Sequence, residues 1–214
     1  FTLILLVQNN DGYRNLSKLI TRSYIEGQVR GEPMARREWL TKDSCDGLLA
    51  LSGGRQGDVG RALVSGNLAL ATSSLQHWLA VFGDRYYLEL IRTERANEEE
   101  LVRQSLMMAA EHKVAVVASN DVRFLESDGY ESHEARVCIH DGRGLADVDR
   151  PRNFSDKQYL RSPQEMLELF ADIPSAVENT IEIARRCNLD LQLGGSVLPE
   201  FPVPAGQSEA EYLA

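Results

Sequence analysis

The sequence predicts an α/β fold in which helices cover a sheet of parallel strands and a group of further helices follows. Strand-like apolar runs recur along the first 120 or so residues, and stretches with the spacing of amphipathic helices separate them. Strands that alternate with helices pair in parallel through right-handed crossovers. A layered α/β fold or a β/α barrel is therefore expected. The four runs are Thr2 to Gln8, Gly47 to Ser52, Tyr86 to Ile91 and Val114 to Ser119.

Three helices are expected among these strands. The first follows the turn residues Asp11-Gly12, because four apolar residues after them recur at i, i+3, i+4 and i+8 and place one apolar stripe on about four turns. These residues are Leu16, Leu19, Ile20 and Tyr24. The second helix covers Leu68 to Phe82. The third covers Glu98 to His112, where three glutamates in a row favour a helix N-terminus.

After Arg123 the pattern changes to consecutive helices. Residues Tyr130 to His140 have helical spacing. The stretch SPQE at 162–165 has the capping-box arrangement with proline at the first helical position, so a helix should run from Pro163 to about Phe170. Pro174 begins another helix, which should continue to Cys187.

A proline-rich stretch, LPEFPVPAGQS at 198–208, indicates a linker. We therefore expect one compact domain over residues 1–194 that ends near Gly194. Residues 195–214 should form the linker and the start of a following part of the protein, because an amphipathic segment begins again at Ser208.

The composition limits the classes of partner. Hydrophobic residues make up 43% of the chain and charged residues 26%, as in ordinary globular proteins. No apolar run approaches the length of a membrane span, and no basic apolar leader opens the chain as given, so a cytoplasmic location without a membrane partner is expected. The net charge of -9 argues against nucleic-acid binding over the whole surface, and any such contact should be local.

The three cysteines predict neither a disulfide framework nor a zinc knuckle. Cys45, Cys138 and Cys187 lie far apart and show no CxxC spacing, so buried thiols in a reducing compartment are expected.

The four histidines do not form an obvious ligand set. His77 and His112 fall in helical stretches and are expected on the surface. His133 and His140 are seven residues apart on one helix face, and we expect a structural role for His133, such as capping or support of another side chain.

A glycine-rich turn, LSGGRQGDVG at 51–60, lies between a strand and a helix, where backbone N–H groups can hold a phosphate. Its glycines match neither the dinucleotide-binding spacing nor the Walker spacing. A tight turn is therefore the favoured interpretation.

The best site candidate is Asn120-Asp121, at the carboxyl end of the fourth strand. Ligands and catalytic groups commonly gather at strand ends in α/β folds, and Asp followed two residues later by His would be typical of a metal site. Here the second position is Arg123. The sequence does not decide whether Asp121 has a functional role or caps the turn into the next segment.

Seven blocks of the sequence, taken in order, resemble the PHP (polymerase and histidinol phosphatase) domain of bacterial replicative DNA polymerase III alpha subunits. The resemblance covers essentially the whole chain, which makes it more specific than any single motif. The blocks are NNDGYRNLSKLITRSYIEG, GLLALSGGRQGDVGRAL, YYLELIRTER, VVASNDVRFL, SHEARVCIHDG, RPRNFSDKQYLRSPQEMLELFADIP and ENTIEIARRCN.

The resemblance implies a distorted seven-stranded β/α barrel, similar to a TIM barrel, whose strand ends can bind divalent metals through histidines, carboxylates and a cysteine. It also implies that the chain is a piece of a longer protein. Residues 1–194 then correspond to a PHP domain that lacks its first strands and two histidine motifs, and residues 195–214 lead into the polymerase core.

Four metal-ligand positions of the family can be compared directly. Members with an active site carry a histidine at the position of Thr2, a cysteine at that of Gly54, and Asp-x-His at the position of Asp121-Val122-Arg123. Only Asp121 is retained, so we expect a vestigial site without bound metal. At an illustrative ~4 Å and an effective dielectric near 20, two unit charges repel by about 4 kcal/mol, and a divalent ion doubles this. Arg123 is therefore expected to replace the metal and to pair with Asp121 or another former ligand.

The resemblance further implies the function. The full-length protein would be a DNA-directed DNA polymerase that uses magnesium and contacts DNA. This segment would have no catalytic or cofactor-binding residues of its own, and it would act as a scaffold that docks a proofreading exonuclease subunit within the replicase. The alternative is a residual metal-dependent phosphoesterase that acts on DNA 3′ ends or pyrophosphate. A separate nucleic-acid-binding module has little support from a net charge of -9.

Overall fold

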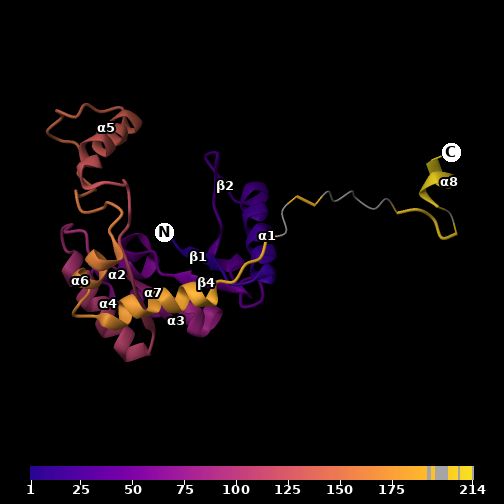
Figure 1. The fold of residues 1–214 in the computed structure, drawn as a ribbon, viewed down its shortest axis with the longest axis horizontal. Helices are drawn as coiled ribbons and strands as arrows, with labels where there is room; N and C mark the ends of the chain where they lie inside the picture. Colours follow the sequence, from indigo (N-terminus) through magenta and orange to yellow (C-terminus); the bar gives the residue numbers. More distant parts are fainter. Residues whose placement is uncertain (192–193, 196–201, 207, 214) are drawn as a thin grey trace.

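The computed structural model describes residues 1–191, 194–195, 202–206 and 208–213. Its centre is a four-stranded sheet with the strand order β1-β4-β5-β6, surrounded by helices (Figure 1). The strands are β1 (Ile4–Val7), β4 (Leu48–Leu51), β5 (Tyr86–Ile91) and β6 (Ala115–Ser119). Strands β4, β5 and β6 are parallel, which confirms the α/β fold class.

Strand β1 runs antiparallel to β4, so the prediction of parallel pairing is wrong for this pair. Helix α1 (Asn10–Glu26) does not lead directly into β4, because a hairpin of β2 (Gln28–Val29) and β3 (Glu32–Pro33) follows it, and then the 3₁₀ turn η1 (Arg37–Trp39). This extra segment returns the chain to the end of β1, where Gln8 N–H donates to the Gly47 carbonyl at 2.9 Å.

The four strands form an open sheet, so the predicted barrel is not confirmed by the structure. The antiparallel direction of β1 has one consequence for the site. The amino end of β1, with Thr2 just before it, lies at the same sheet edge as the carboxyl ends of the parallel strands, and Thr2 N–H donates to the Gln56 carbonyl at 3.0 Å.

Helices cover both faces of the sheet, because alternate strand residues point to opposite sides. Leu48, Ala50, Leu88 and Leu90 face the larger core, which α2 (Asp58–Val64), α3 (Leu68–Phe82) and α4 (Glu98–His112) complete. On the other face, α7 (Pro174–Arg186) packs Ile183 against Leu49, Tyr87 and Val117. The 3₁₀ turn η2 (Gly54–Gln56) connects β4 with α2, and the 3₁₀ turn η3 (Gly83–Arg85) connects α3 with β5.

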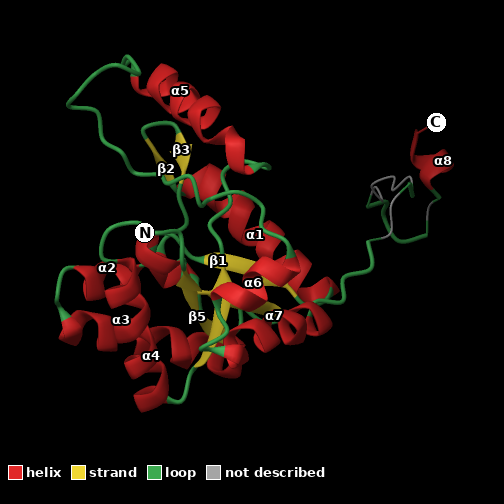
Figure 2. Cartoon of the chain, turned by 60° about the vertical axis from the view of Figure 1, so that its left-hand side comes forward, coloured by secondary structure: helices red, strands yellow, loops and turns green. Residues whose placement is uncertain are grey.

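The chain after β6 is helical, as predicted. It contains η4 (Ser127–Gly129), α5 (Tyr130–Asp141), α6 (Pro163–Leu169), α7 and α8 (Glu209–Leu213). The capping box at the start of α6 is present, with Ser162 and Glu165 each accepting from the other's backbone N–H. Helix α5 and the loop that follows it project away from the sheet (Figure 2).

The predicted bounds of β5, α3 and α4 match the observed ones, but the predicted apolar stripe on α1 is only partly buried. Leu19 is buried as predicted, whereas Ile20 and Tyr24 are 49% and 59% exposed. The predicted linker lies in part outside the described residues, and so do residues 192 and 193, just before the proposed domain end at Gly194. Among the helices that the structure describes, none is long and apolar enough to cross a membrane.

Candidate functional site

The candidate site is a cleft at the sheet edge where the parallel strands end. Its volume is about 400 Å³. Thr2, Asp121 and Arg123 line it, so the structure brings together three of the four positions that the resemblance singles out. Gly54, the fourth, is buried beside it, and a Cβ placed there would lie 3.9 Å from a Glu89 carboxylate oxygen.

Each carboxylate oxygen of Asp121 forms an ion pair with an arginine, and one of them also accepts a hydrogen bond from an amide. Arg123 Nη2 lies 2.7 Å from Asp121 Oδ1, so of the predicted partners of Arg123, which were Asp121 or another former ligand, the structure shows Asp121. Arg95 Nη1 lies 2.9 Å from Asp121 Oδ2, and Gln158 Nε2 donates to the same oxygen at 3.0 Å. Asp121 therefore holds two permanent cations and one amide.

The loop after β6 is shaped to make these contacts. Asp121 has φ 44°, a left-handed conformation that short polar side chains tolerate better than most. Gln158 is fully buried, and its carbonyl accepts from Arg123 N–H at 2.7 Å. The Arg123 guanidinium also lies 5.4 Å from the centre of the Phe154 ring, a cation–π contact. Residues 154–158 thus position Asp121 and Arg123 from a distant part of the chain.

Arg95 and Glu98 extend the network inward, and sequence reasoning placed neither one in the site. Glu98 is buried, and its carboxylate accepts from both the backbone N–H and the hydroxyl of Thr93, the latter at 2.9 Å. Arg95 Nη2 lies 3.3 Å from Glu98 Oε1. Glu98 thus does more than interact with the helix N-terminus, because it fixes the guanidinium that holds Asp121. The i, i+3 spacing of Arg95 and Glu98 is the feature of the sequence that could have predicted their ion pair.

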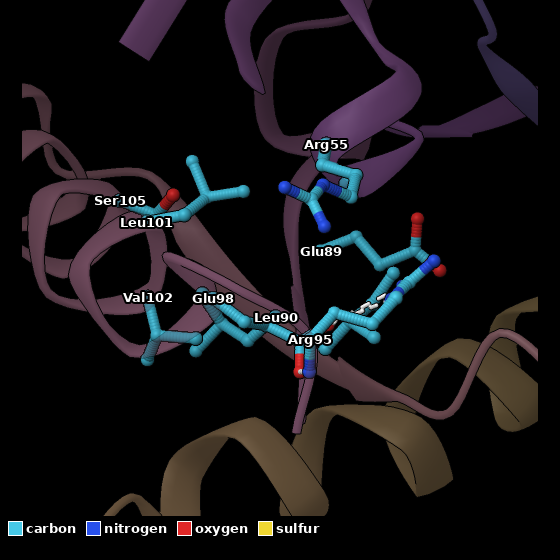
Figure 3. Close-up of a pocket in the computed structure, with 10 residues that line it drawn as sticks. Arg55, Glu89, Leu90, Arg95, Glu98, Leu101, Val102 and Ser105 are labelled. Carbon is cyan, nitrogen blue, oxygen red and sulfur yellow. Dashed lines mark hydrogen bonds and ion pairs between the residues drawn. The ribbon is translucent and has the colours of Figure 1, made fainter. Parts of the chain in front are cut away.

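Figure 3 shows the side chains of Glu89, Arg95 and Glu98 between β5, helix α4 and the turn that carries Arg55. The open space among them is only about 10 Å³, which has room for about one water molecule. This part of the site is therefore packed, whereas the cleft beside Asp121 is open.

Glu89 is a further buried acid that sequence reasoning missed. It interrupts the apolar strand YYLELI, which was the signal that could have found it. Burial raises the pKa of its carboxyl group, and the nearby Asp121 carboxylate raises it further, whereas hydrogen bonds from Ser119 and the Gly53 backbone act in the opposite direction. Glu89 is therefore less easily ionised than an ordinary glutamate.

Replacing Glu89 with glutamine is expected to stabilise the domain at pH 7. A carboxyl group whose pKa is higher in the folded state favours folding below its unfolded pKa, and this contribution is lost as pH rises through the folded pKa. The advantage of Glu89→Gln should therefore shrink when pH falls to about 4, near the ordinary glutamate pKa. Hydrogen exchange of the β5 amides at the two pH values measures this, with the exposed Glu111→Gln as a control. A variant that is less stable than the parent at pH 7 would contradict it.

The glycine-rich turn uses its backbone groups internally, which confirms the tight-turn interpretation. Gly57 N–H donates to the carbonyls of Gly53 and Gly54 at 3.1 and 3.2 Å, and Gln56 N–H donates to Gly53 at 3.1 Å. Gly53 and Gly54 have φ values of 75° and 51°, which glycine adopts without strain.

The predicted structural role of His133 is confirmed, but as packing and not as a helix cap. Its ring is buried against Phe124 and Phe154, and its Nδ1 lies 3.0 Å from an Arg136 nitrogen. Burial lowers the pKa of His133, and the Arg136 charge adds to this effect. His140, seven residues later, is exposed.

His77 and His112 are half-buried, so the prediction that they lie on the surface is only partly right. Cys45 and Cys138 are buried thiols as predicted, whereas Cys187 is only partly buried.

The side chains present do not suit the metal cluster that the resemblance implies for active members. Thr2 and Gly54 supply no imidazole or thiolate, and Arg123 supplies a positive charge. Among the residues that the structure describes, no group of three or more His, Cys, Asp or Glu side chains is arranged to hold a metal ion.

Comparison with known proteins gives a family match for the first part of the chain. Residues 1–93 match the PHP domain family, which agrees with an α/β fold whose candidate site lies at the strand ends.

Over almost its whole length the chain is similar to DNA polymerase III subunit alpha, so the resemblance stated from the sequence is confirmed. It is 48% identical over 211 residues, 99% of this chain, to the proteins of that name from Pseudomonas aeruginosa and Escherichia coli strain K12. It is 45% identical over 202 residues, 94% of this chain, to the one from Haemophilus influenzae. The chain spans only 17–18% of the length of these relatives.

Proposed function

We propose that this chain is part of a replicative DNA polymerase, the alpha subunit of DNA polymerase III, which carries out template-directed DNA synthesis in the cytoplasm. The proposal is supported by the name of the relatives and by similarity over 99% of the chain. The nucleotidyl-transfer reaction, the magnesium it uses and the contacts with DNA would belong to the parts of the protein that these residues do not include.

Within that protein, the segment is a noncatalytic domain without a bound metal. The observation that carries this proposal is the engagement of both Asp121 oxygens, one by Arg123 at 2.7 Å and the other by Arg95 at 2.9 Å. A metal cluster needs carboxylate lone pairs that are free, and it is repelled by guanidinium groups that never lose their charge. Metal-dependent hydrolysis needs the ion to generate the attacking hydroxide, so it has no basis here.

The retained fold then acts as a scaffold. The sheet is part of a distorted β/α barrel in the full-length protein, and the domain carries the proofreading exonuclease subunit of the replicase. These roles rest on the resemblance to the family, and the relatives are themselves named as one subunit of a larger enzyme.

The metal content of the purified full-length protein tests the noncatalytic role. After equilibration with zinc or manganese, the Asp121 site should retain less than a stoichiometric amount of either ion. The residual phosphoesterase is the competing function. Stoichiometric metal together with phosphodiesterase activity that disappears in Asp121→Asn would establish that function instead.

Replacing Arg123 with histidine should not restore metal binding. Although Arg123→His recreates the Asp-x-His pattern, Arg95 would still occupy Asp121 Oδ2, and Thr2 and Gly54 would still supply no strong ligand. Elemental analysis of the variant should therefore show no more zinc or manganese than the parent. A gain of one equivalent from this single change would mean that Arg123 alone had masked an intact site.

A further inference from the structure

A second cleft, with a volume of about 740 Å³, lies beside the Asp121 site and is rich in arginine. The two clefts share the lining residues Arg55 and Gln56. Four arginines and one glutamate line the second cleft. They are Arg55 from η2, Arg61 from α2, Arg95 and Glu94 from the loop before α4, and Arg152 from the loop after α5.

Three of these arginines have no acidic partner among the described residues. Arg95 is neutralised by Glu98 and Asp121. Arg55 makes one hydrogen bond, from Nη2 to the Ala96 carbonyl at 3.1 Å, and Figure 3 shows it extending from its turn toward α4. In the part of the chain that the structure describes, neither Arg61 nor Arg152 takes part in an ion pair. Glu94 is the one carboxylate in the described lining.

The local charge is therefore opposite to that of the chain as a whole. Within the described residues, the three guanidinium groups without an acidic partner and the carboxylate of Glu94 leave an excess of two positive charges in the cleft, in a chain whose net charge is -9. Like charges that converge on one cleft repel each other, and an anion that binds among them relieves this repulsion. Neutral donors are available too, because the side-chain amides of Gln56 and Asn153 also line the cleft.

We propose that this cleft binds the phosphate groups of a ligand. The guanidinium fork matches the oxygens of phosphate in a bidentate manner, and arginine keeps its charge at any physiological pH. The lining comes from three separate parts of the chain, so a ligand in the cleft would connect η2 and α2 with the loops before α4 and after α5. The ligand is either a free polyphosphate or the backbone of a nucleic acid.

The test uses the full-length protein in EDTA, so that metal-dependent binding at a polymerase active site does not contribute. The cleft variant is Arg61→Gln/Arg152→Gln, which removes two exposed arginines. The matched control is Arg30→Gln/Arg185→Gln, which removes two exposed arginines that line neither cleft. Two probes are used, namely radiolabelled inorganic pyrophosphate in equilibrium dialysis and a single-stranded thymidine oligonucleotide at several salt concentrations.

For a free polyphosphate ligand, pyrophosphate should bind the parent and the control equally and the cleft variant about tenfold or more weakly, equivalent to at least about 1.4 kcal/mol. For a nucleic-acid ligand, the salt dependence of oligonucleotide binding should become shallower in the cleft variant only, by about 0.7 for each phosphate that this variant no longer neutralises. Either result supports the proposal and identifies the source of the phosphate. If the cleft variant and the control behave alike with both probes, the proposal is wrong. The proposed metal-free role of the Asp121 site would be unaffected, since neither variant changes that network.

Discussion

Replacing Asp121 with alanine is expected to destabilise the domain by about 3 kcal/mol, because it leaves two arginines near or within the protein interior without their carboxylate. Arg95 has a side chain that is only 8% exposed, and it would keep Glu98 as its remaining acidic partner. Arg123 is 33% exposed and would lose its only ion pair among the described residues, so its share of the loss is smaller. Hydrogen exchange of the β5 and β6 amides in the full-length protein measures the effect.

An exposed aspartate in the same region provides the control for this substitution. Asp128 lies in η4 and forms no ion pair within the described part of the chain, so Asp128→Ala should change stability by less than about 0.5 kcal/mol. The loss caused by Asp121→Ala should be the same with and without EDTA. A loss that appears only when metal is present would mean that Asp121 stabilises the domain by binding an ion and not by pairing with arginines.

Replacing Glu98 with alanine should have an effect of similar size, about 2–3 kcal/mol, for a different reason. The carboxylate accepts from the backbone N–H and the hydroxyl of Thr93, which is fully buried, so both donors would lose their partner inside the protein. Arg95 would lose one of its two carboxylates at the same time. Hydrogen exchange at Thr93 and in the first turn of α4 should show the loss most clearly.

Glu111, near the other end of the same helix, is the matched control. It is exposed, and its negative charge is unfavourable at a helix C-terminus, so Glu111→Ala should be neutral or slightly stabilising. Equal effects of Glu98→Ala and Glu111→Ala would mean that the buried hydrogen bonds of Glu98 contribute little. The support of Asp121 by Arg95 would then need another explanation.

Local signals in the sequence were sufficient for most helices and for β5. The capping box at Ser162 and the prolines at 163 and 174 define helix starts by their own backbone chemistry, and the structure confirms them. The direction of β1 could not be predicted in this way. It depends on where the chain returns after the hairpin of β2 and β3, whose strands of two residues each are too short to give an alternating pattern.

The site was predictable only in part for the same reason. Asp121 and Arg123 are two residues apart, so their contact could be expected from the sequence alone. Arg95 and Gln158 lie 26 and 37 residues from Asp121 in the sequence, and only the packing of the loops before α4 and after α5 brings them to it. Tertiary structure likewise brings Arg61 and Arg152 to the same cleft, although they are 91 residues apart in the sequence.

In the proposed function, guanidinium groups occupy the place where related active domains would hold metal ions. Anomalous diffraction from crystals of the full-length protein soaked in manganese or zinc tests it most directly. We expect the guanidinium groups of Arg123 and Arg95 to remain in direct contact with the Asp121 carboxylate. No anomalous peak should lie within about 3 Å of that carboxylate, the range of metal–oxygen bonds. One or more peaks at that distance, with either arginine displaced from Asp121, would contradict the claim.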